Sequence, residues 1–202
     1  MTPRNPIQGD AMTKDDKDKR ARILEAAAKL FATQPFHKVL LSDVAAAASV
    51  GKGTLYLYFR SKEDLFMGIL LRGFSQLLER MHSTLADSGA SPEQQLTDVV
   101  REMVLHLQRK SHMTELLRGA YIGYPTDGEW ADKRAELRGL IESVIRRGVE
   151  QGVFQDDHPE LTAQYIPGML RAVSLHRPAM DDAETVSRHA ADFILQGLRR
   201  QD

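Results

Sequence analysis

The sequence predicts an all-α protein of about nine helices, and three observations lead to this prediction. Apolar residues recur at spacings of three and four over long segments, which places them on one face of a helix. Capping residues such as Ser91-Pro92 open these segments, and Pro35 or Gly152 ends them. The stretch from Leu41 to Lys62 also has the pattern of two short helices joined by a tight turn.

Residues 1–14 contain several turn-forming residues and show no apolar period, so a disordered tail is expected there. The first helix is expected over Asp16–Thr33, because Pro35 cannot continue it. Its apolar stripe consists of Ile23, Leu24, Ala27, Leu30 and Phe31. The segment Lys14–Arg22 mixes basic and acidic residues. It fits either a solvated helix start or a basic approach to nucleic-acid phosphates through Lys17, Lys19, Arg20 or Arg22.

The next helix is short, and Ser42 is expected to cap it because its hydroxyl can accept from a free backbone N–H. A turn at Ser49-Val50-Gly51 follows, with Val50 as a buried plug. The second short helix is expected over Lys52–Phe59. At about 100° per residue, Leu55 and Phe59 point into the core. Tyr56 and Tyr58 flank that face, and the outward residues are Gly53, Thr54 and Leu57.

The rest of the chain reads as a series of longer helices. Ser61, with Asp64 three residues on, is expected to cap a fourth helix that continues to Leu85. The later helices are expected over residues Pro92–Lys110, His112–Ile122, Glu129–Gln151, from Pro159 with a kink at Pro167-Gly168, and Asp182–Arg200.

Composition narrows the classes of function. The chain of 202 residues has no cysteine, which removes disulfides, zinc–thiolate sites and thiol catalysis. No apolar run is long enough to span a bilayer, so a cytoplasmic protein without a membrane partner is expected. The net charge of −1 divides into +3 over residues 1–64 and −4 over residues 65–202. A mildly basic N-terminal part suits local contact with DNA.

The stretch GKGTLYLYFRSKEDLF carries the most specific information. It resembles the tetracycline-repressor (TetR) type of transcriptional regulator, and the resemblance is close from Arg20 to about Leu71. The family usually has glycine where Ser49 stands, so a left-handed backbone is expected at Ser49. It usually has serine where Gly51 stands, and glycine caps slightly less well.

The resemblance implies a division of the chain into two functional parts. A helix-turn-helix DNA-binding domain is expected over residues 15–78, with the motif over 40–59 and a connecting helix from 62. A helical effector-binding and dimerisation domain is expected over residues 79–202. The expected partners are double-stranded DNA with a palindromic operator, a second copy through the last two helices, and a small-molecule effector.

The resemblance therefore implies a DNA-binding transcriptional regulator, and specifically a repressor that an effector releases from its operator. The expected route is a shift of the fourth helix that changes the spacing of the two recognition helices. Two alternatives stay open: a DNA-binding activator or a regulator controlled by a protein partner, and a small-molecule-binding helical protein with a vestigial helix-turn-helix.

The candidate DNA contacts lie on the two short helices and at the start of the fourth. Thr54 suits a phosphate or base edge, Leu57 a thymine methyl group, and Lys52 a guanine edge or phosphate. The tyrosines suit phosphates, or else are half-buried core. No Arg, Asn or Gln faces outward, so specificity is expected from paired half-sites and DNA shape. The full set is Ser42, Lys52, Gly53, Thr54, Tyr56, Leu57, Tyr58 and Lys62.

The candidate effector pocket is built from Met, aromatic and His residues, which suit a mostly apolar ligand with one polar anchor. Its members are Met103, His106, Leu107, Met113, Leu117, Tyr121, Trp130, Tyr165 and Met169, and the alternative for each is ordinary core packing. Neither a metal site nor a cofactor is expected, although Glu102, His106, His112 and Glu115 lie close in sequence. The absence of any catalytic motif predicts that the protein is not an enzyme.

Overall fold

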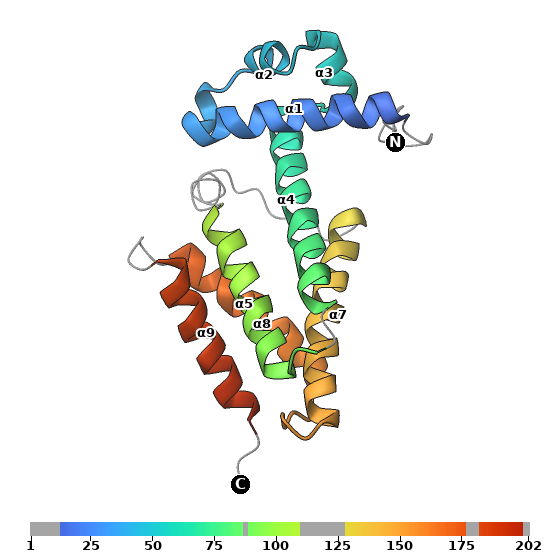
Figure 1. The fold of residues 1–202 in the computed structure, drawn as a ribbon. Helices are drawn as coiled ribbons and strands as arrows, with labels where there is room; N and C mark the ends of the chain where they lie inside the picture. The colour runs from blue at the N-terminus through green and yellow to red at the C-terminus, as the bar shows by residue number, and fades with distance from the viewer. Residues whose placement is uncertain (1–12, 87–88, 110–127, 177–181, 200–202) are drawn as a thin grey trace. The chain divides into compact units, whose positions relative to one another are not determined.

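The computed structural model describes residues 13–86, 89–109, 128–176 and 182–199. Within these ranges the protein is all-helical, as predicted, with eight α-helices and one isolated β-bridge (Figure 1). The elements are α1 (Lys14–Thr33), a 3-10 turn η1 (Phe36–Lys38), α2 (Leu41–Ala47), α3 (Lys52–Tyr58), α4 (Lys62–Leu85), α5 (Pro92–Arg109), α7 (Gly128–Glu150), α8 (Pro159–His176) and α9 (Ala183–Leu198). The helix expected over His112–Ile122 lies outside the described residues.

The chain forms two compact units, Met1–Arg72 and Gly73–Asp202. Helix α4 begins in the first unit and ends in the second. The sequence places its domain boundary after residue 78, further along the same helix. Among the described helices, none combines the length and the apolar character needed to cross a membrane.

The first unit is built on α1, whose start is set by a capping box. The Asp16 backbone N–H donates to the Thr13 hydroxyl at 3.2 Å, and the Thr13 N–H donates to the Asp16 carboxylate at 3.3 Å. This reciprocal pair begins the helix at Lys14, two residues before the expected start. The helix ends before Pro35, and its buried face consists of Ile23, Leu24, Ala26, Ala27 and Phe31.

An aromatic cluster joins the end of α1 to α4. Phe31 and Phe36 are stacked with ring centroids 5.3 Å apart, and Phe66 of α4 meets both rings edge-on at 5.6 Å. Offset and edge-to-face pairs of this kind add to the energy of apolar burial. The η1 turn that carries Phe36 is therefore packed against two helices.

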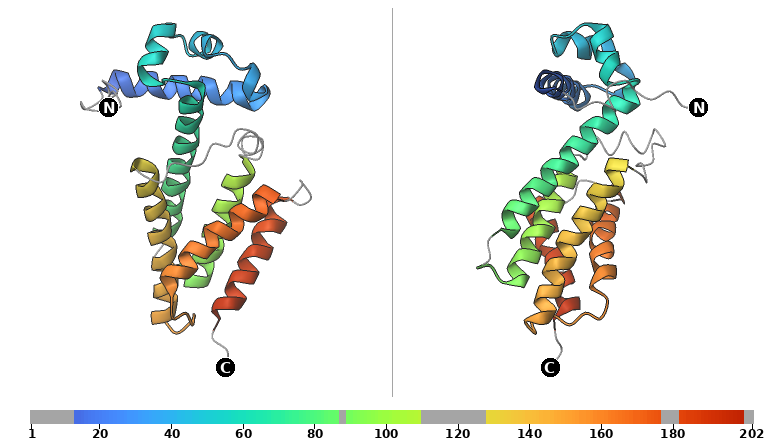
Figure 2. Two further views of the ribbon diagram at one scale, coloured as in Figure 1. Left: turned by 180° about the vertical axis from the view of Figure 1, so that it is seen from behind. Right: turned by 90° about the vertical axis from the view of Figure 1, so that its right-hand side faces the viewer.

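The second unit has α5 at its centre. Helix α5 packs against α7, α8 and α9, and it runs beside α9 in the views of Figures 1 and 2. Its apolar stripe faces the core: Leu107 is partly buried, and the fully buried members are Leu96, Val99, Val100, Met103 and Val104. The N-cap predicted at Ser91 is present, since the Gln94 N–H donates to the Ser91 hydroxyl at 3.2 Å. Helix α8 continues as one helix through Pro167.

The link from α7 to α8 turns back tightly around a phenylalanine. Gly152 adopts a positive φ of 71°, which glycine reaches without strain. The N–H groups of Val153 and Phe154 both donate to the Gly148 carbonyl, at 2.9 and 3.0 Å. Phe154 is 2% exposed, and its ring lies directly on the backbone of Gly148. Glycine is required at this position because a Cβ atom there would lie 2.1 Å from the ring.

We therefore expect Gly148→Ala to lower the free energy of unfolding by about 1–3 kcal/mol, because the Phe154 ring has to move within a packed core. Gly139→Ala is the matched control on the same helix, since a Cβ atom there meets nothing within 4 Å. It should raise the free energy of unfolding by up to about 1 kcal/mol. Urea denaturation followed by circular dichroism measures both changes. Equal stability of the two variants would contradict the close packing at Gly148.

Candidate nucleic-acid interface

The turn between α2 and α3 has a left-handed residue at its centre. Ser49 has a φ of 53°, which confirms the expectation for this position. The N–H groups of Ser49 and Val50 donate to Ala46 and Ala45 at 3.0 Å, and these bonds hold the turn. Gly51 has an ordinary extended conformation, and a Cβ atom there would meet Thr54 Oγ1 at 3.6 Å. Gly51 is the N-cap of α3 and supplies no side-chain acceptor, and Val50, which was expected to be a buried plug, is only half-buried.

The N-cap predicted at Ser42 is wrong. Helix α2 begins at Leu41, because the Leu40 carbonyl accepts the N–H groups of Asp43 and Val44 at 3.1 and 3.2 Å. Leu40 therefore occupies the cap position and offers no side-chain acceptor. Ser42 lies one residue inside the helix, exposed, with its hydroxyl 3.4 Å from the Asp43 carboxylate. It remains on the surface of the first turn of α2.

Helix α3 is held by one apolar edge. Leu55 is 0% and Phe59 2% exposed, which confirms the predicted inward face. The Phe59 ring packs so closely on α4 that a Cβ atom on Gly68 would lie 2.9 Å from it. The same Cβ would lie 3.1 Å from Leu24 of α1. A small residue in α4 thus makes the space in which the end of α3 is anchored.

The opposite edge of α3 faces solvent. Lys52 and Gly53 are exposed, Thr54 is half-buried, and Leu57 is 52% exposed. Tyr56 is 45% exposed, so it lies on the surface and is not the half-buried core residue of the alternative interpretation. The exposed edge of α3 therefore carries the Lys52 ammonium, the hydroxyl groups of Thr54 and Tyr56, and the apolar side chain of Leu57.

Tyr58 is placed differently from the sequence prediction. It is 9% exposed, and its hydroxyl donates to the Asp16 carboxylate at 2.8 Å instead of lying free at the flank. Burial, and then this hydrogen bond, raises the pKa of Tyr58 to about 12, so the hydroxyl stays protonated at neutral pH. The bond from Thr13, followed by that from Tyr58, lowers the pKa of Asp16. Tyr58 therefore ties α3 to the start of α1.

The sequence places Lys62 in the DNA-contact set because backbone N–H groups at the start of a helix suit a phosphate, and that contact stays a prediction. The Ser61 cap of α4 is present, with the Asp64 N–H donating to the Ser61 hydroxyl at 3.1 Å. The Lys62 ammonium, however, donates to the carbonyls of Phe36 and Val39 at 2.7 and 3.2 Å. It also lies 4.6 Å from the centre of the Phe36 ring. The side chain is thus turned into the first unit.

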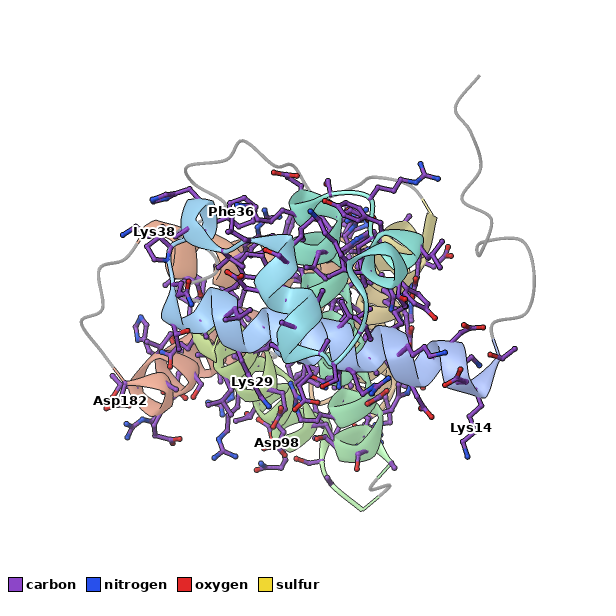
Figure 3. All side chains as sticks on the ribbon, turned by 90° about the horizontal axis from the view of Figure 1, so that it is seen from above. Lys14, Lys29, Phe36, Lys38, Asp98 and Asp182 are labelled. Atoms are coloured by element: carbon purple, nitrogen blue, oxygen red, sulfur yellow. The ribbon has the colours of Figure 1, made fainter. Side chains whose placement is uncertain are left out.

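The basic residues near the start of α1 divide into two groups. Lys17 and Arg22 are exposed. Lys19 pairs with Asp15, and the Arg20 guanidinium lies 5.4 Å from the centre of the Phe59 ring. Figure 3 shows Lys14 at one end of α1 and Phe36 and Lys38 near the other.

Leu40 is a surface residue that sequence reasoning missed. It is 58% exposed, and it joins Tyr56 and Leu57 as the large hydrophobic side chains exposed in the described part of the first unit. All three lie on the helix-turn-helix. The signal that could have found it is a leucine at a helix cap, where a polar residue is usual.

The effector candidates separate into a buried and an exposed set. Met103 and His106 of α5 and Trp130 of α7 are buried, at 4%, 8% and 8% exposed. Phe74 of α4 joins them, with its ring 6.3 Å from that of His106 and 6.0 Å from that of Trp130. We call Phe74, His106 and Trp130 the α4–α5–α7 aromatic cluster. Leu107 is partly buried against the same core.

Tyr165 does not belong to this buried cluster, which corrects the sequence prediction. It is 66% exposed, because its position on α8 faces away from the core. With Met169 and Phe193 it lines a groove of about 460 Å³ along α8 and α9. Met113, Leu117 and Tyr121 lie outside the described residues.

The helices α8 and α9 carry an exposed apolar face. Its members are Leu161, Tyr165, Val173 and Phe193, which are 41%, 66%, 39% and 63% exposed. Of the residues Glu102, His106, His112 and Glu115, Glu102 pairs with Arg80 at 2.8 Å, and His112 and Glu115 lie outside the described residues. Within the ranges that the structure describes, no three His, Asp or Glu side chains are grouped to hold a metal ion.

Comparison with known proteins gives matches over both units. Residues 23–69 match the family model of bacterial regulatory proteins of the tetR family, and residues 89–198 match that of the tetracyclin repressor-like C-terminal domain. The regulator YhgD of Bacillus subtilis, which is uncharacterised, is 30% identical over 192 residues, covering 90% of this chain and 97% of YhgD. The repressor KstR2 of Mycobacterium tuberculosis is 24% identical over 200 residues, covering 91% and 94%.

Solved structures share the fold. A TetR/AcrR regulator from Thermobifida fusca superposes with a TM-score of 0.76 at 22% identity, covering 91% of this chain and all of that one. The regulator FadR of Bacillus subtilis, solved in complex with stearoyl-CoA, gives a TM-score of 0.66 at 20% identity, covering 88% and 98%.

Proposed function

The chain belongs to the tetR family of bacterial regulatory proteins and is a DNA-binding transcriptional regulator, and on that premise we propose that it is a repressor released by a small-molecule effector. The observation that carries the proposal is the anchoring of α3. Leu55 and Phe59 fix one edge of this helix in the core, and the edge with Lys52 and Leu57 is left exposed. A helix presented in this way can enter a major groove.

The proposed DNA contacts are those residues of the predicted set that lie on the surface. Lys52 reaches a phosphate or guanine edge, Thr54 a phosphate or base edge, and Leu57 a thymine methyl group. Tyr56 and Ser42 reach phosphates, and the absence of a side chain at Gly53 lets the helix approach closely. Tyr58 is left out, since its hydroxyl is bonded to Asp16.

A dimer is part of this proposal, because one short helix reads only one half of a palindromic operator. The exposed apolar face of α8 and α9 supports it, since four large hydrophobic side chains are costly to leave in water. Helices α8 and α9 of two copies would form a four-helix bundle and cover this face. A two-fold dimer uses the same surface on both copies.

The effector is proposed to bind at the α4–α5–α7 aromatic cluster. Two buried rings and one partly buried ring on three helices suit a largely apolar molecule, and the His106 imidazole suits one polar group on it. Phe74 lies on α4, the helix that also begins in the first unit. A ligand that moves Phe74 would shift α4, change the separation of the two recognition helices, and so release the operator.

The DNA contacts are tested on sequences selected from a random pool by the wild-type protein. We expect Lys52→Gln and Thr54→Ala each to weaken binding about tenfold, the usual cost of one good contact. Both variants should unfold at the wild-type temperature. Lys29→Gln is the control, because Lys29 lies on α1 and pairs with Glu25 at 2.9 Å. Wild-type affinity in both α3 variants would contradict the assignment.

The dimer is tested by light scattering after size-exclusion chromatography. Phe193→Glu should convert a dimer into a folded monomer, because a carboxylate then replaces the 63% exposed ring on the shared face. Leu57→Glu is the matched control, with a 52% exposed side chain in the other unit. It should remain a dimer and lose DNA binding. A dimeric Phe193→Glu variant, or a monomeric wild type, would refute this interface.

The effector site is tested by the fluorescence of Trp130, which is the single tryptophan of the chain. Candidate ligands are screened for release of bound DNA, beginning with stearoyl-CoA because FadR was solved with it. A ligand that releases DNA should also change the Trp130 emission. His106→Leu should raise the concentration needed for release about tenfold, and exposed His82→Gln should not. Release that is unchanged in His106→Leu would place the ligand elsewhere.

A further inference from the structure

Lys62 stands where an isolated cation is unfavourable. It is the first residue of α4, and the N-terminus of a helix carries a partial positive charge. The same turn carries Glu63 and Asp64, yet among the residues that the structure describes no ion pair joins the Lys62 ammonium to a carboxylate. It donates instead to two backbone carbonyls and lies over an aromatic ring, at the distances given above. An ammonium with these partners is well satisfied inside its own unit.

The two carbonyls belong to the segment that leads into α2. Phe36 begins η1, and Val39 directly precedes Leu40, the cap residue of α2. Neither η1 nor α2 has a side-chain hydrogen bond at its cap, so the caps do not fix the path of this segment. Lys62 therefore supplies a link between the start of α4 and the entry to α2. Packing completes the link, since Val39 is 1% exposed and Phe36 stacks on Phe31.

We propose that Lys62 is a positioning residue for DNA binding, which holds the first turn of α2 in place through the Phe36 and Val39 carbonyls and does not itself contact a phosphate. The proposal rests on the proposed function, in which the α2–α3 face meets DNA. In this proposal, loss of Lys62 weakens DNA binding because the first turn of α2, with its exposed Ser42, is no longer held in place against the DNA.

Salt dependence separates positioning from contact. A lysine that neutralises a phosphate contributes about one unit to the slope of log affinity against log salt concentration. Lys62→Met keeps the apolar stem and removes the charge and the donors. We expect it to weaken binding to the selected DNA about tenfold and to leave the slope unchanged. Lys52→Met, the matched control, should reduce the slope by about one. A slope reduced equally in both variants would overturn the proposal, because Lys62 would then be a phosphate contact.

A double-mutant cycle separates positioning from general stability. Ser42→Ala should weaken DNA binding in the wild type and have a much smaller effect when combined with Lys62→Met, since α2 is then already displaced. Lys62→Arg, which keeps donors and charge, should restore most of the affinity and of the Ser42→Ala effect. Additive effects of Ser42→Ala and Lys62→Met would overturn the proposal, and so would wild-type affinity of Lys62→Met.

Two further outcomes are distinguishable. If Lys62→Met is unfolded at the assay temperature, Lys62→Gln replaces it, because the amide keeps two N–H donors without the charge and the same slope comparison applies. If Lys52→Met and Leu57→Glu also bind DNA as the wild type does, the α2–α3 face itself is wrongly assigned. The positioning proposal and the proposed function are then both refuted. If the α3 variants weaken DNA binding as expected and the Lys62 variants do not behave as described, only the positioning proposal is refuted.

Discussion

The arrangement of the first unit depends on how the end of α3 is buried. Phe59 lies in the space that Gly68 leaves on α4 and beside Leu24 of α1, so three helices meet at one ring. The Arg20 guanidinium lies over the same ring, 5.4 Å from its centre. With Leu55 buried one turn earlier, α3 has one orientation available, and its remaining side chains are turned outward as a consequence.

The sequence predicted those features that follow from local rules. Helical period separated Leu55 and Phe59 from Leu57, and the resemblance to a family that usually has glycine at this position pointed to the left-handed backbone at Ser49. Periodicity could not find partners that are remote in the chain. The hydroxyl of Tyr58 is bonded to a carboxylate 42 residues away, and Lys62 to carbonyls 23 and 26 residues away. For that reason the sequence predicted a free Tyr58 hydroxyl at the flank of α3, and it gave no signal for the carbonyl partners of the Lys62 ammonium.

The second unit shows a different limit of sequence reasoning. Met103, His106, Trp130 and Tyr165 all fall at helical spacings, and a period cannot tell a buried stripe from an apolar face that is open to a partner. The structure separates them, because His106 and Trp130 are buried and pack against the partly buried Phe74, whereas Tyr165 lies on the surface with Phe193. The apolar residues of α8 are therefore of two kinds: Ile166 and Leu170 are buried in the core, and Tyr165 is exposed on the outer face.

Asp16 has a practical consequence for work with this protein. Its carboxylate accepts from the Thr13 hydroxyl at 2.7 Å and from Tyr58 of α3 at 2.8 Å. The beginning of α1 and the DNA-facing helix therefore share one acceptor. A shortened protein that lacks residues through Thr13 would lose one of these two hydroxyl donors. Purified protein should therefore keep Thr13, so that Asp16 and Tyr58 hold α3 as they do in the full chain.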